Sequence, residues 1–421
     1  MVVRSVRMRG QAPRVFTGGE MGFAQSNRSP SRTRHFAPGE YTRGSPANTQ
    51  TNTSDPCCVA FCLMLTAMLT VSSRATDKPA GTSETAQQFV QVVRTHHGAM
   101  GDDIWAKRGL DGFCFIKSEL RSYSVGKFWG PAAAKTAAYQ PPPPAADADP
   151  AARAKALRRL ARRDPLSPIV SFHRQLAKAG VELVLLPVPG KVAIYPDKLD
   201  RRLAAGRRVD RHHKAFYTEL RAAGVNVIDI ADAMIAMRTR GTPAHCRQDT
   251  HWSPQAVRMA AGKLAGIVRK QPWYAAAPKV NVHVKPADVA VRGDIVANML
   301  KGVALPKETL RIEVVSVAGK PIDDSDRRSP IVLMGDSHAL VYHDRRLLAA
   351  NAGLADLLCA ELRLGSIDLL GVMGSGANAG RLALARRRDN LAGKTCVIWC
   401  LAAREFTESP AGWYDVPVIR R

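Results

Sequence analysis

The feature that most constrains the fold is a run of four apolar residues, Ile331-Val332-Leu333-Met334, which leads into Gly335-Asp336-Ser337-His338. Such a run predicts a strand buried on both faces, as in a parallel sheet covered by helices. The glycine permits a sharp turn, and residues 339–362 have a helical pattern. Ser337 is therefore expected between a strand and a helix, with its hydroxyl in a crevice and N–H groups nearby to stabilise an oxyanion. A turn with a capping serine is the alternative.

A repeated order of helix, glycine and strand begins near Pro168 and predicts an α/β domain with a parallel sheet flanked by helices. Gly180 and Gly224 each separate a helical stretch from an apolar run. Sheet strands are predicted at 181–186, 225–230, 331–334, 367–372 and 396–401, and further strands beside Asp111-Gly112, at 280–284 and at 310–317. Helices are predicted at 82–97, 151–163, 169–179, 202–223, 233–238, 254–269, 339–362 and 380–391.

Composition divides the chain into three parts. Residues 1–56 are rich in Arg, Ser, Gly and Pro and are predicted to be a disordered basic extension. The apolar run 57–71 is short for a membrane span but suits a signal peptide, with Ser73-Arg74-Ala75 as a small-x-small cleavage site. We expect 57–75 to act as a signal peptide or a membrane anchor, and 76–421 to be an exported catalytic domain in the periplasm or cell envelope.

The net charge of +25 indicates either an anionic partner or a solvated basic surface. No zinc-finger spacing, RNA-binding aromatic signature or helix-turn-helix pattern is present, so a nucleic-acid partner is not expected. No C-x-x-C pair occurs among the eight cysteines, and neither a metal nor a cofactor is expected. The densest basic cluster consists of Arg201, Arg202, Arg207, Arg208, Arg211 and Lys214, which could hold the carboxylates of a polyuronate.

The position of the histidines restricts the chemistry open to Ser337. An α/β-hydrolase requires its histidine well after the serine, but the last histidines are His338 and His343. The base must therefore lie upstream. Two Asp-x-His patterns occur, Asp249-Thr250-His251 in a loop and Asp210-Arg211-His212 in a helical stretch. The loop pattern is preferred because residues two apart in extended chain share a side, so the carboxylate can orient the imidazole.

These motifs resemble the SGNH hydrolase-like domain of alginate O-acetyltransferases of the AlgJ/AlgX type. The resemblance rests on Asp249-Thr250-His251-Trp252-Ser253-Pro254, on Gly335-Asp336-Ser337-His338, and on Val397-Ile398-Trp399 with Arg404-Glu405-Phe406. It extends to residues 187–191 and 195–196, more faintly to 111–113, and covers roughly 100–410. The fold it implies is a circularly permuted, three-layer, flavodoxin-like α/β fold with irregular insertions.

The resemblance implies acetyl transfer onto an exported polysaccharide, with Ser337 as nucleophile, His251 as general base and Asp249 as its orienting acid. Gly374 fits the oxyanion glycine of such enzymes, whereas 402–404 lacks their asparagine, so Asn378 is the expected substitute. Lys191, Tyr195, Trp252 and Arg404 are expected to line the cleft and bind substrate. An anionic or neutral exopolysaccharide is the expected partner, together with a membrane-bound O-acyltransferase that supplies acetyl groups.

Three functions are compatible with these residues. The first is a polysaccharide O-acetyltransferase that works through an acetyl-serine. The second is a carbohydrate esterase of the same fold, which uses water in place of the sugar hydroxyl. The third is a catalytically silent polysaccharide-binding protein, against which the intact Asp249, His251 and Ser337 argue. For an enzyme, we expect His251 Nε2 within hydrogen-bond reach of Ser337 Oγ, and an exposed Asp210–His212 pair remote from the serine.

Overall fold

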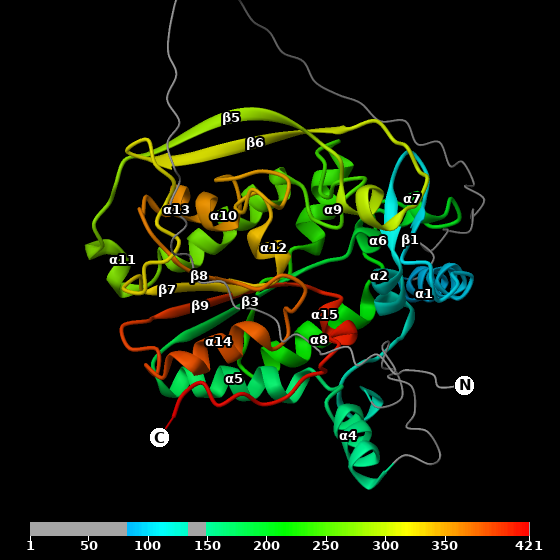
Figure 1. Cartoon of the computed structure of the whole chain (residues 1–421), viewed down its shortest axis with the longest axis horizontal. Helices are drawn as coiled ribbons and strands as arrows, with labels where there is room; N and C mark the ends of the chain where they lie inside the picture. The colour runs from blue at the N-terminus through cyan, green and yellow to red at the C-terminus, as the bar shows by residue number, and fades with distance from the viewer. Residues whose placement is uncertain (1–81, 134–148, 421) are drawn as a thin grey trace, which may run out of the picture. The chain divides into compact units, whose positions relative to one another are not determined.

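The computed structural model describes residues 82–133 and 149–420 (Figure 1). The chain divides into residues 1–78 and 79–421, and every described residue belongs to the second of these units. The basic extension 1–56 and the apolar segment 57–75 lie outside the described residues. In the part of the chain that is described, no helix combines the length and the apolar character that crossing a membrane requires.

A sheet of five parallel strands confirms the predicted α/β fold (Figure 1). Its order is β4-β3-β9-β7-β8, and all its pairings are parallel. The strands are β3 (Glu182–Val188), β4 (Asn226–Val227), β7 (Ile331–Gly335), β8 (Asp368–Gly371) and β9 (Cys396–Ala402). Because β7 lies between β9 and β8, the loops that follow these three strands emerge together at one edge of the sheet.

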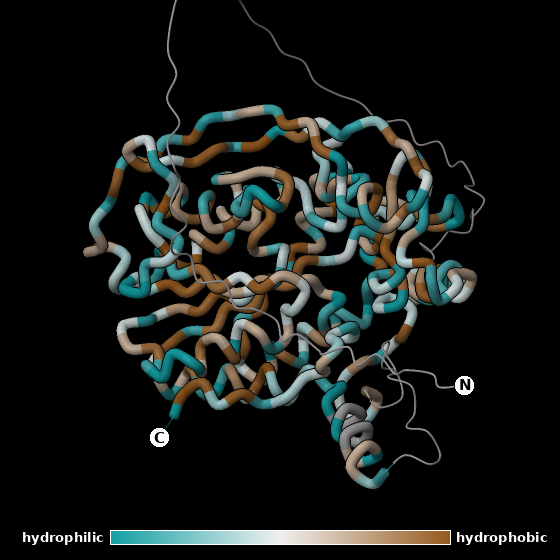
Figure 2. Tube along the Cα trace, viewed as in Figure 1, coloured by the Kyte–Doolittle hydropathy of each residue, from teal (hydrophilic) through white to brown (hydrophobic). Residues whose placement is uncertain are grey.

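Apolar residues alternate between the two faces of the sheet, as expected for strands covered on both sides. Along β3, Val184 and Leu186 belong to one core and Leu183 and Leu185 to the other. Helices α9 (Ala231–Thr239), α10 (Pro254–Val268) and α13 (Leu354–Leu362) cover the first face, and α5 (Leu166–Lys178), α8 (Arg211–Ala222) and α14 (Ala379–Arg387) cover the second. Figure 2 shows the apolar strands between these helix layers.

Two antiparallel pairs lie outside the parallel sheet. Strands β1 (Ala106–Arg108) and β2 (Cys114–Ile116) form the predicted turn at Asp111. Strands β5 (Val282–Val291) and β6 (Glu308–Val317) form a long hairpin beside α10 and α13 (Figure 1). The remaining helical segments are α1 (Thr82–Gly98), α2 (Lys117–Ser124), η1 (Gly130–Ala132), α4 (Pro150–Ala161), α6 (Lys191–Ile194), α7 (Pro196–Leu199), α11 (Pro272–Ala276), η2 (Ile295–Met299), α12 (Ser337–Leu340) and α15 (Glu405–Glu408).

Several predicted boundaries are wrong. The predicted helix 202–223 begins only at Arg211. Arg208 lies in the loop before it and forms ion pairs with Asp210 and, after β4, with Asp229. The predicted helix 339–362 is two helices, α12 and α13, since Tyr342 and other residues between them adopt left-handed backbone angles. Helix α14 ends at Arg387, before the left-handed Arg388, and only two residues of the predicted strand 225–230 pair in the sheet.

Gly335 is required for close approach of two strands. A Cβ atom at this position would lie 1.9 Å from the carbonyl oxygen of Cys400 on β9. The sequence predicts a glycine that permits a turn, whereas the structure shows one that lets β9 pass next to the end of β7. The position of Ser337, two residues later, therefore depends on this strand contact.

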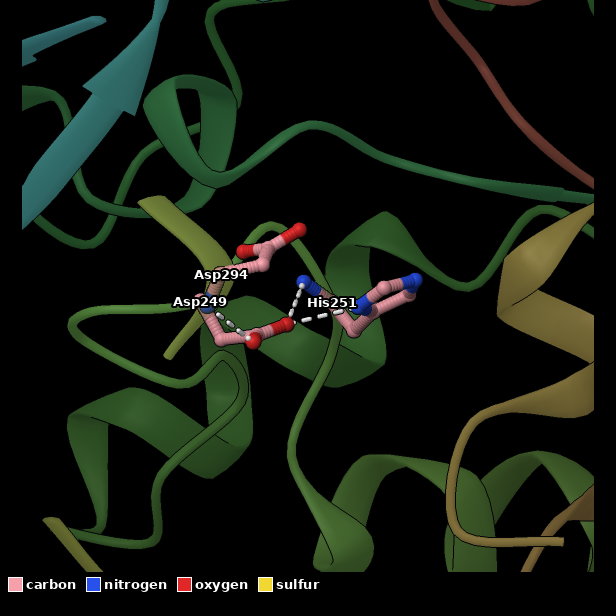
Figure 3. Close-up of side chains that lie close together, drawn as sticks. All are labelled: Asp249, His251 and Asp294. Carbon is pink, nitrogen blue, oxygen red and sulfur yellow. Dashed lines mark hydrogen bonds and ion pairs between the residues drawn. The ribbon is translucent and has the colours of Figure 1, made fainter. Parts of the chain in front are cut away.

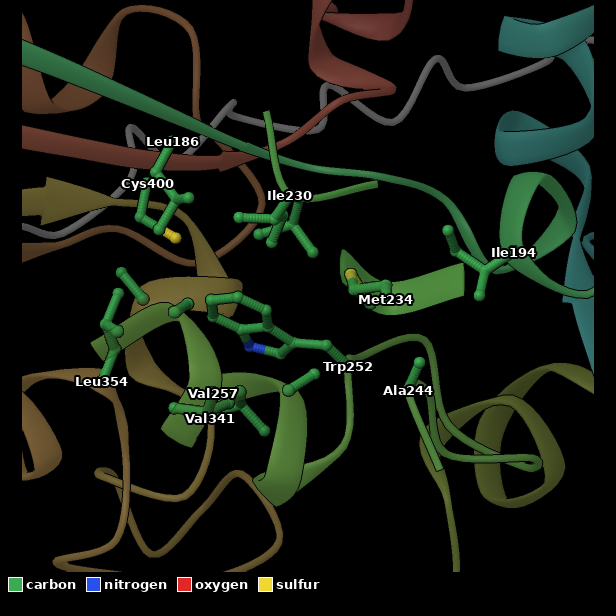
Figure 4. Close-up of a cluster of buried hydrophobic side chains, with 14 of the residues drawn as sticks. Leu186, Ile194, Ile230, Met234, Ala244, Trp252, Val257, Val341, Leu354 and Cys400 are labelled. Carbon is green, nitrogen blue, oxygen red and sulfur yellow. The ribbon is translucent and has the colours of Figure 1, made fainter. Parts of the chain in front are cut away.

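Trp252 packs in the apolar core rather than lining an open cleft (Figure 4). Its side chain is fully buried in the core cluster that also contains Leu186, Ile230 and Cys400. The indole Nε1 donates a hydrogen bond to the carbonyl oxygen of His338 at 3.2 Å. Trp252 therefore supports the segment that follows Ser337, and its expected role in binding substrate stays a prediction that this burial does not favour.

We predict that Trp252→Ala lowers the free energy of unfolding by about 3–5 kcal/mol, because it removes a buried aromatic side chain and leaves a cavity. Trp105→Ala is the matched control, since Trp105 is 69% exposed and its replacement should change stability by less than about 0.5 kcal/mol. Chemical denaturation of both variants measures the difference. Equal stabilities would contradict the role of Trp252 in the core.

Candidate active site

Asp249 and His251 form a buried pair in the loop before α10, as predicted. The Asp249 carboxylate accepts a hydrogen bond from His251 Nδ1 at 2.6 Å and a second from the His251 backbone N–H at 3.1 Å (Figure 3). Ser253 then caps α10 by accepting from the N–H of Ala256. The Asp-x-His spacing thus lets one carboxylate bind both the ring and the backbone of the same histidine.

The tautomer of neutral His251 follows from this pair. Because Nδ1 donates to Asp249, Nε2 carries the lone pair and can accept a proton. Nε2 points away from the carboxylates (Figure 3), is buried and has no hydrogen-bond partner among the described residues. Burial opposes the charged imidazolium, but the hydrogen bond to Asp249 and its negative charge outweigh burial and raise the pKa of His251 above 6.5.

Ser337 is the first residue of α12, and it is half-buried between the buried Asp336 and His338. Asp336 accepts hydrogen bonds from the N–H of His338 at 2.8 Å and from the N–H of Ala402 at 2.8 Å. These bonds join the serine turn to the end of β9. The ring of His338 lies against His251, with 4.9 Å between ring centroids.

The predicted hydrogen bond between His251 Nε2 and Ser337 Oγ is not made in this structure, because Nε2 is without a partner among the described residues. The contact between His251 and His338 nevertheless brings the loop that carries the base against the turn that carries the serine. Such bonds are commonly loose without substrate and tighten when it binds. The catalytic roles of Ser337, His251 and Asp249 stay predictions.

A second pair of acids, Asp336 and Glu405, lies beside the serine turn and was not identified from the sequence. Glu405 accepts a hydrogen bond from the N–H of Gly376 at 3.1 Å. Burial and the charge of Asp336 raise the pKa of Glu405 to about 7. Burial lowers the pKa of His338 to about 4 despite the adjacent Asp336, so this imidazole is neutral at pH 7. The sequence signal that could have identified Glu405 was its place in the Arg404-Glu405-Phe406 motif.

Asp294 is a further residue of the site that was not identified from the sequence. Its backbone N–H donates to Asp249 Oδ2 at 2.7 Å, and its carboxylate accepts from the N–H and the hydroxyl of Thr250, both at 2.7 Å. Asp249, His251 and Asp294 are close enough to surround a cation (Figure 3). Both carboxylates already accept hydrogen bonds that a metal ion would have to displace, so the donor set fits a hydrogen-bonded network better than a metal centre.

Two predicted substrate-binding residues prove to be buried supports. Lys191 is 1% exposed, and its ammonium donates to the carbonyl oxygens of Cys114, Arg247 and Asp249. The hydroxyl of buried Tyr195 accepts from the N–H of Ala244 at 2.9 Å. Both side chains bind backbone atoms of the segment 244–249, which does not favour contact with substrate, and their expected role in binding substrate stays a prediction.

The other predicted residues differ in accessibility. Asn378 is buried, donates to the carbonyl oxygen of Gly412 and accepts from Arg381. These bonds occupy its amide and do not favour the expected oxyanion role, which stays a prediction. Gly374 is exposed in the loop after β8, with a left-handed φ of +72°. Arg404 is half-buried, and its positive charge lowers the pKa of both His251 and His338. Gly374 and Arg404 remain candidates.

The basic cluster is less free than its sequence suggests. Arg208 forms ion pairs with Asp210, Asp229 and Asp232, and Arg202 pairs with Asp200. The other members, Arg201, Arg207, Arg211 and Lys214, are exposed. Asp210 is buried against Arg208 and does not orient His212, so the expectation of an exposed Asp210–His212 pair is wrong.

We predict that Asp249→Asn lowers the pKa of His251, because the charge that offsets burial is removed. In the wild type the raised pKa means that protonated His251 adds stability below about pH 6.5, and this stability is lost as the pH rises through the folded-state pKa. NMR titration of the imidazole measures the shift. His343, held by Asp324 and Asp356 with its pKa raised to about 10, is an internal control. An unchanged His251 pKa would contradict the assignment.

Comparison with known families gives a match in the region that contains this site. Residues 150–358 match a family model described as "SGNH hydrolase-like domain, acetyltransferase AlgX". The chain is 27% identical over 180 residues to the probable alginate O-acetylase AlgJ of Pseudomonas fluorescens, which is 41% of this chain and 45% of that relative. It is 32% identical over 98 residues to the AlgJ of Pseudomonas aeruginosa, 23% of this chain and 25% of the relative. The chain thus spans less than half the length of these relatives.

A solved structure supports the same fold. The O-acetyltransferase domain of Pseudomonas putida AlgJ superposes with a TM-score of 0.51 at 20% sequence identity, covering 72% of this chain and 92% of that domain. Residues 150–358 are therefore similar to the SGNH hydrolase-like domain of AlgX, and the chain shares the fold of the AlgJ domain.

Proposed function

We propose that this protein is a polysaccharide O-acetyltransferase that acts through Ser337, His251 and Asp249. The observation that carries the proposal is the buried His251, whose Nδ1 is held by Asp249 at 2.6 Å while Nε2 is left free beside the serine turn. A free, oriented imidazole nitrogen next to a serine at a helix start is the arrangement that acyl transfer requires. The printed names of the AlgJ relatives support O-acetylation as the reaction.

In the first half-reaction, Ser337 Oγ attacks the carbonyl carbon of an acetyl ester while His251 Nε2 takes the hydroxyl proton. The tetrahedral intermediate then collapses, and His251 returns the proton to the departing alcohol of the donor. The product is acetyl-Ser337. Ionised Asp249 stabilises the imidazolium that forms between these steps, which is consistent with the raised pKa of His251.

Backbone N–H groups are the proposed oxyanion donors. The N–H of Ser337 opens α12 and has no acceptor inside the helix. The N–H of Gly374 has no acceptor within the described residues, and its loop is anchored by the bond from Gly376 to Glu405. Removing one such donor typically costs about 2.7–4 kcal/mol of transition-state stabilisation. Arg404 would add positive charge at the same edge of the sheet.

In the second half-reaction, a sugar hydroxyl attacks the carbonyl carbon of acetyl-Ser337 while His251 Nε2 takes its proton. The bond from the acetyl carbon to Ser337 Oγ then breaks, and His251 returns the proton to the serine. If water attacks in place of the sugar, the enzyme is an esterase with the same catalytic residues. The names of the relatives favour alginate as the acceptor polymer, and we propose an exopolysaccharide of this kind as the substrate. A membrane-bound acyltransferase as the source of acetyl groups is part of the same proposal.

The test is incubation of the full chain with p-nitrophenyl acetate, with and without an alginate oligosaccharide. We expect acetylated sugar, and mass spectrometry should locate a transient acetyl group on Ser337. Ser337→Ala should reduce turnover at least about 1,000-fold, as expected when a catalytic nucleophile is removed, without unfolding the protein.

Ser325→Ala is the matched control, because Ser325 is exposed and its hydroxyl bonds to Asp323 nearby in sequence. It should keep wild-type turnover. Release of acetate without acetylated sugar would favour the esterase. A Ser337→Ala variant with more than about a tenth of wild-type activity would refute the assignment of the nucleophile.

We further propose that residues 76–421 form the catalytic domain and that the segment 57–75 exports or anchors it, so that the enzyme acts in the periplasm or cell envelope. The support is the apolar run 57–71 followed by Ser73-Arg74-Ala75. An acceptor polysaccharide outside the cytoplasm would require an exported enzyme.

We predict that protein isolated from its native host either begins near residue 76 or remains attached to the membrane through 57–71, because that run suits a signal core or an anchor. N-terminal sequencing after cell fractionation measures this. Recovery of intact residues 1–421 in the cytoplasmic fraction would contradict export.

A further inference from the structure

The β5–β6 hairpin binds the loop that carries Asp249 and His251, although it lies outside the parallel sheet. Glu308, the first residue of β6, is buried and accepts hydrogen bonds from the N–H groups of Arg247 and Gln248. Asp294, three residues after β5, accepts from Thr250 and donates its own N–H to Asp249. The carboxylates of Glu308 and Asp294, from the hairpin and its connecting segment, therefore fix the backbone on both sides of Asp249.

Gly293 shows how closely these segments approach. A Cβ atom on Gly293 would lie 2.2 Å from the carbonyl oxygen of Gln248 and 2.5 Å from the N atom of Asp249. Only glycine allows this contact, since the atoms it would strike belong to the backbone. Ile295 and Val296, which follow Asp294, are buried in a small apolar cluster with β1 and β2, and this packing anchors the segment.

We propose that Asp294 is a positioning residue for the acid–base pair: its N–H fixes the Asp249 carboxylate, and its side chain fixes Thr250, so that His251 is held with Nε2 free. Replacing the side chain of Asp294 leaves its backbone N–H, the 2.7 Å donor to Asp249 Oδ2, in the chain. Thr250 would lose the acceptor of both its N–H and its hydroxyl, which frees the segment between Asp249 and His251. The part of this inference that concerns catalytic activity rests on the proposed function.

Asp294 also contributes charge to the environment of His251. The groups that face this imidazole are Asp249 on its own loop, Asp294 after β5, His338 in α12 and Arg404 after β9. Asp249 and Asp294 raise the pKa of His251, Arg404 lowers it, and His338 is neutral at pH 7. Burial and the charge of Asp249 raise the pKa of Asp294 itself. Removing the charge of Asp294 should therefore make His251 less basic.

The experiment compares Asp294→Asn and Asp294→Ala in the full chain by two measurements: NMR titration of His251 and hydrolysis of p-nitrophenyl acetate. Both variants keep the backbone N–H that binds Asp249. Asp294→Asn also keeps one acceptor for Thr250, so we expect it to retain most of the wild-type kcat while the pKa of His251 falls. Asp294→Ala should lower kcat by about 10- to 100-fold through misplacement of the base, with KM for this small ester unchanged.

Asp288→Asn is the matched control. It makes the same charge change on β5, but Asp288 is exposed and pairs with Arg311 on β6, so neither measurement should change. A His251 pKa that stays at the wild-type value in Asp294→Asn, or a wild-type kcat in Asp294→Ala, would overturn the proposal. If Ser337→Ala remains fully active, the proposed function fails, whereas the His251 titration still decides the role of Asp294.

Discussion

The hydrogen bond from His251 Nδ1 to the Asp249 carboxylate is the interaction on which the site depends. Asp249 is almost fully buried, and an ionised carboxylate is costly away from water unless it accepts several hydrogen bonds. Three donors reach it: the His251 ring, the His251 backbone and the N–H of Asp294. The same bonds that make this burial tolerable fix the imidazole, which leaves Nε2 as the free ring nitrogen.

The acids around the site occur in two pairs, and in each pair the environment separates the two pKa values. Asp249 and Asp336 accept backbone and histidine hydrogen bonds, and their pKa values are lowered although burial alone would raise them. Asp294 and Glu405 lie next to these charges, and burial together with the like charge raises their pKa values. The ionised member of each pair thus makes its neighbour harder to ionise.

Supports for the site come from segments distant in sequence. Lys191 from the loop after β3, Trp252 beneath the serine turn and Glu308 from β6 each bind backbone atoms of the segments that carry the proposed catalytic residues. Buried polar groups of this kind must be matched with partners, so their positions are specified closely. Because a displacement of about 1 Å can cost about 100-fold in rate, such supports bear directly on catalysis.

Hydrophobic periodicity, glycine stops and the capping Ser253 are local signals, and they were enough to predict the parallel α/β architecture, the Asp-x-His loop and the strand that leads to Ser337. The surroundings of these features depend on tertiary packing. Lys191, Tyr195, Trp252 and Asn378 stand in or beside the correct loops, but their side chains are buried by contacts that loop position does not specify. Asp294 and Glu405 meet the site through hydrogen bonds between residues far apart in the chain. No local sequence pattern encodes these contacts, because they depend on how the β5–β6 hairpin, the edge of the sheet and the loops pack together.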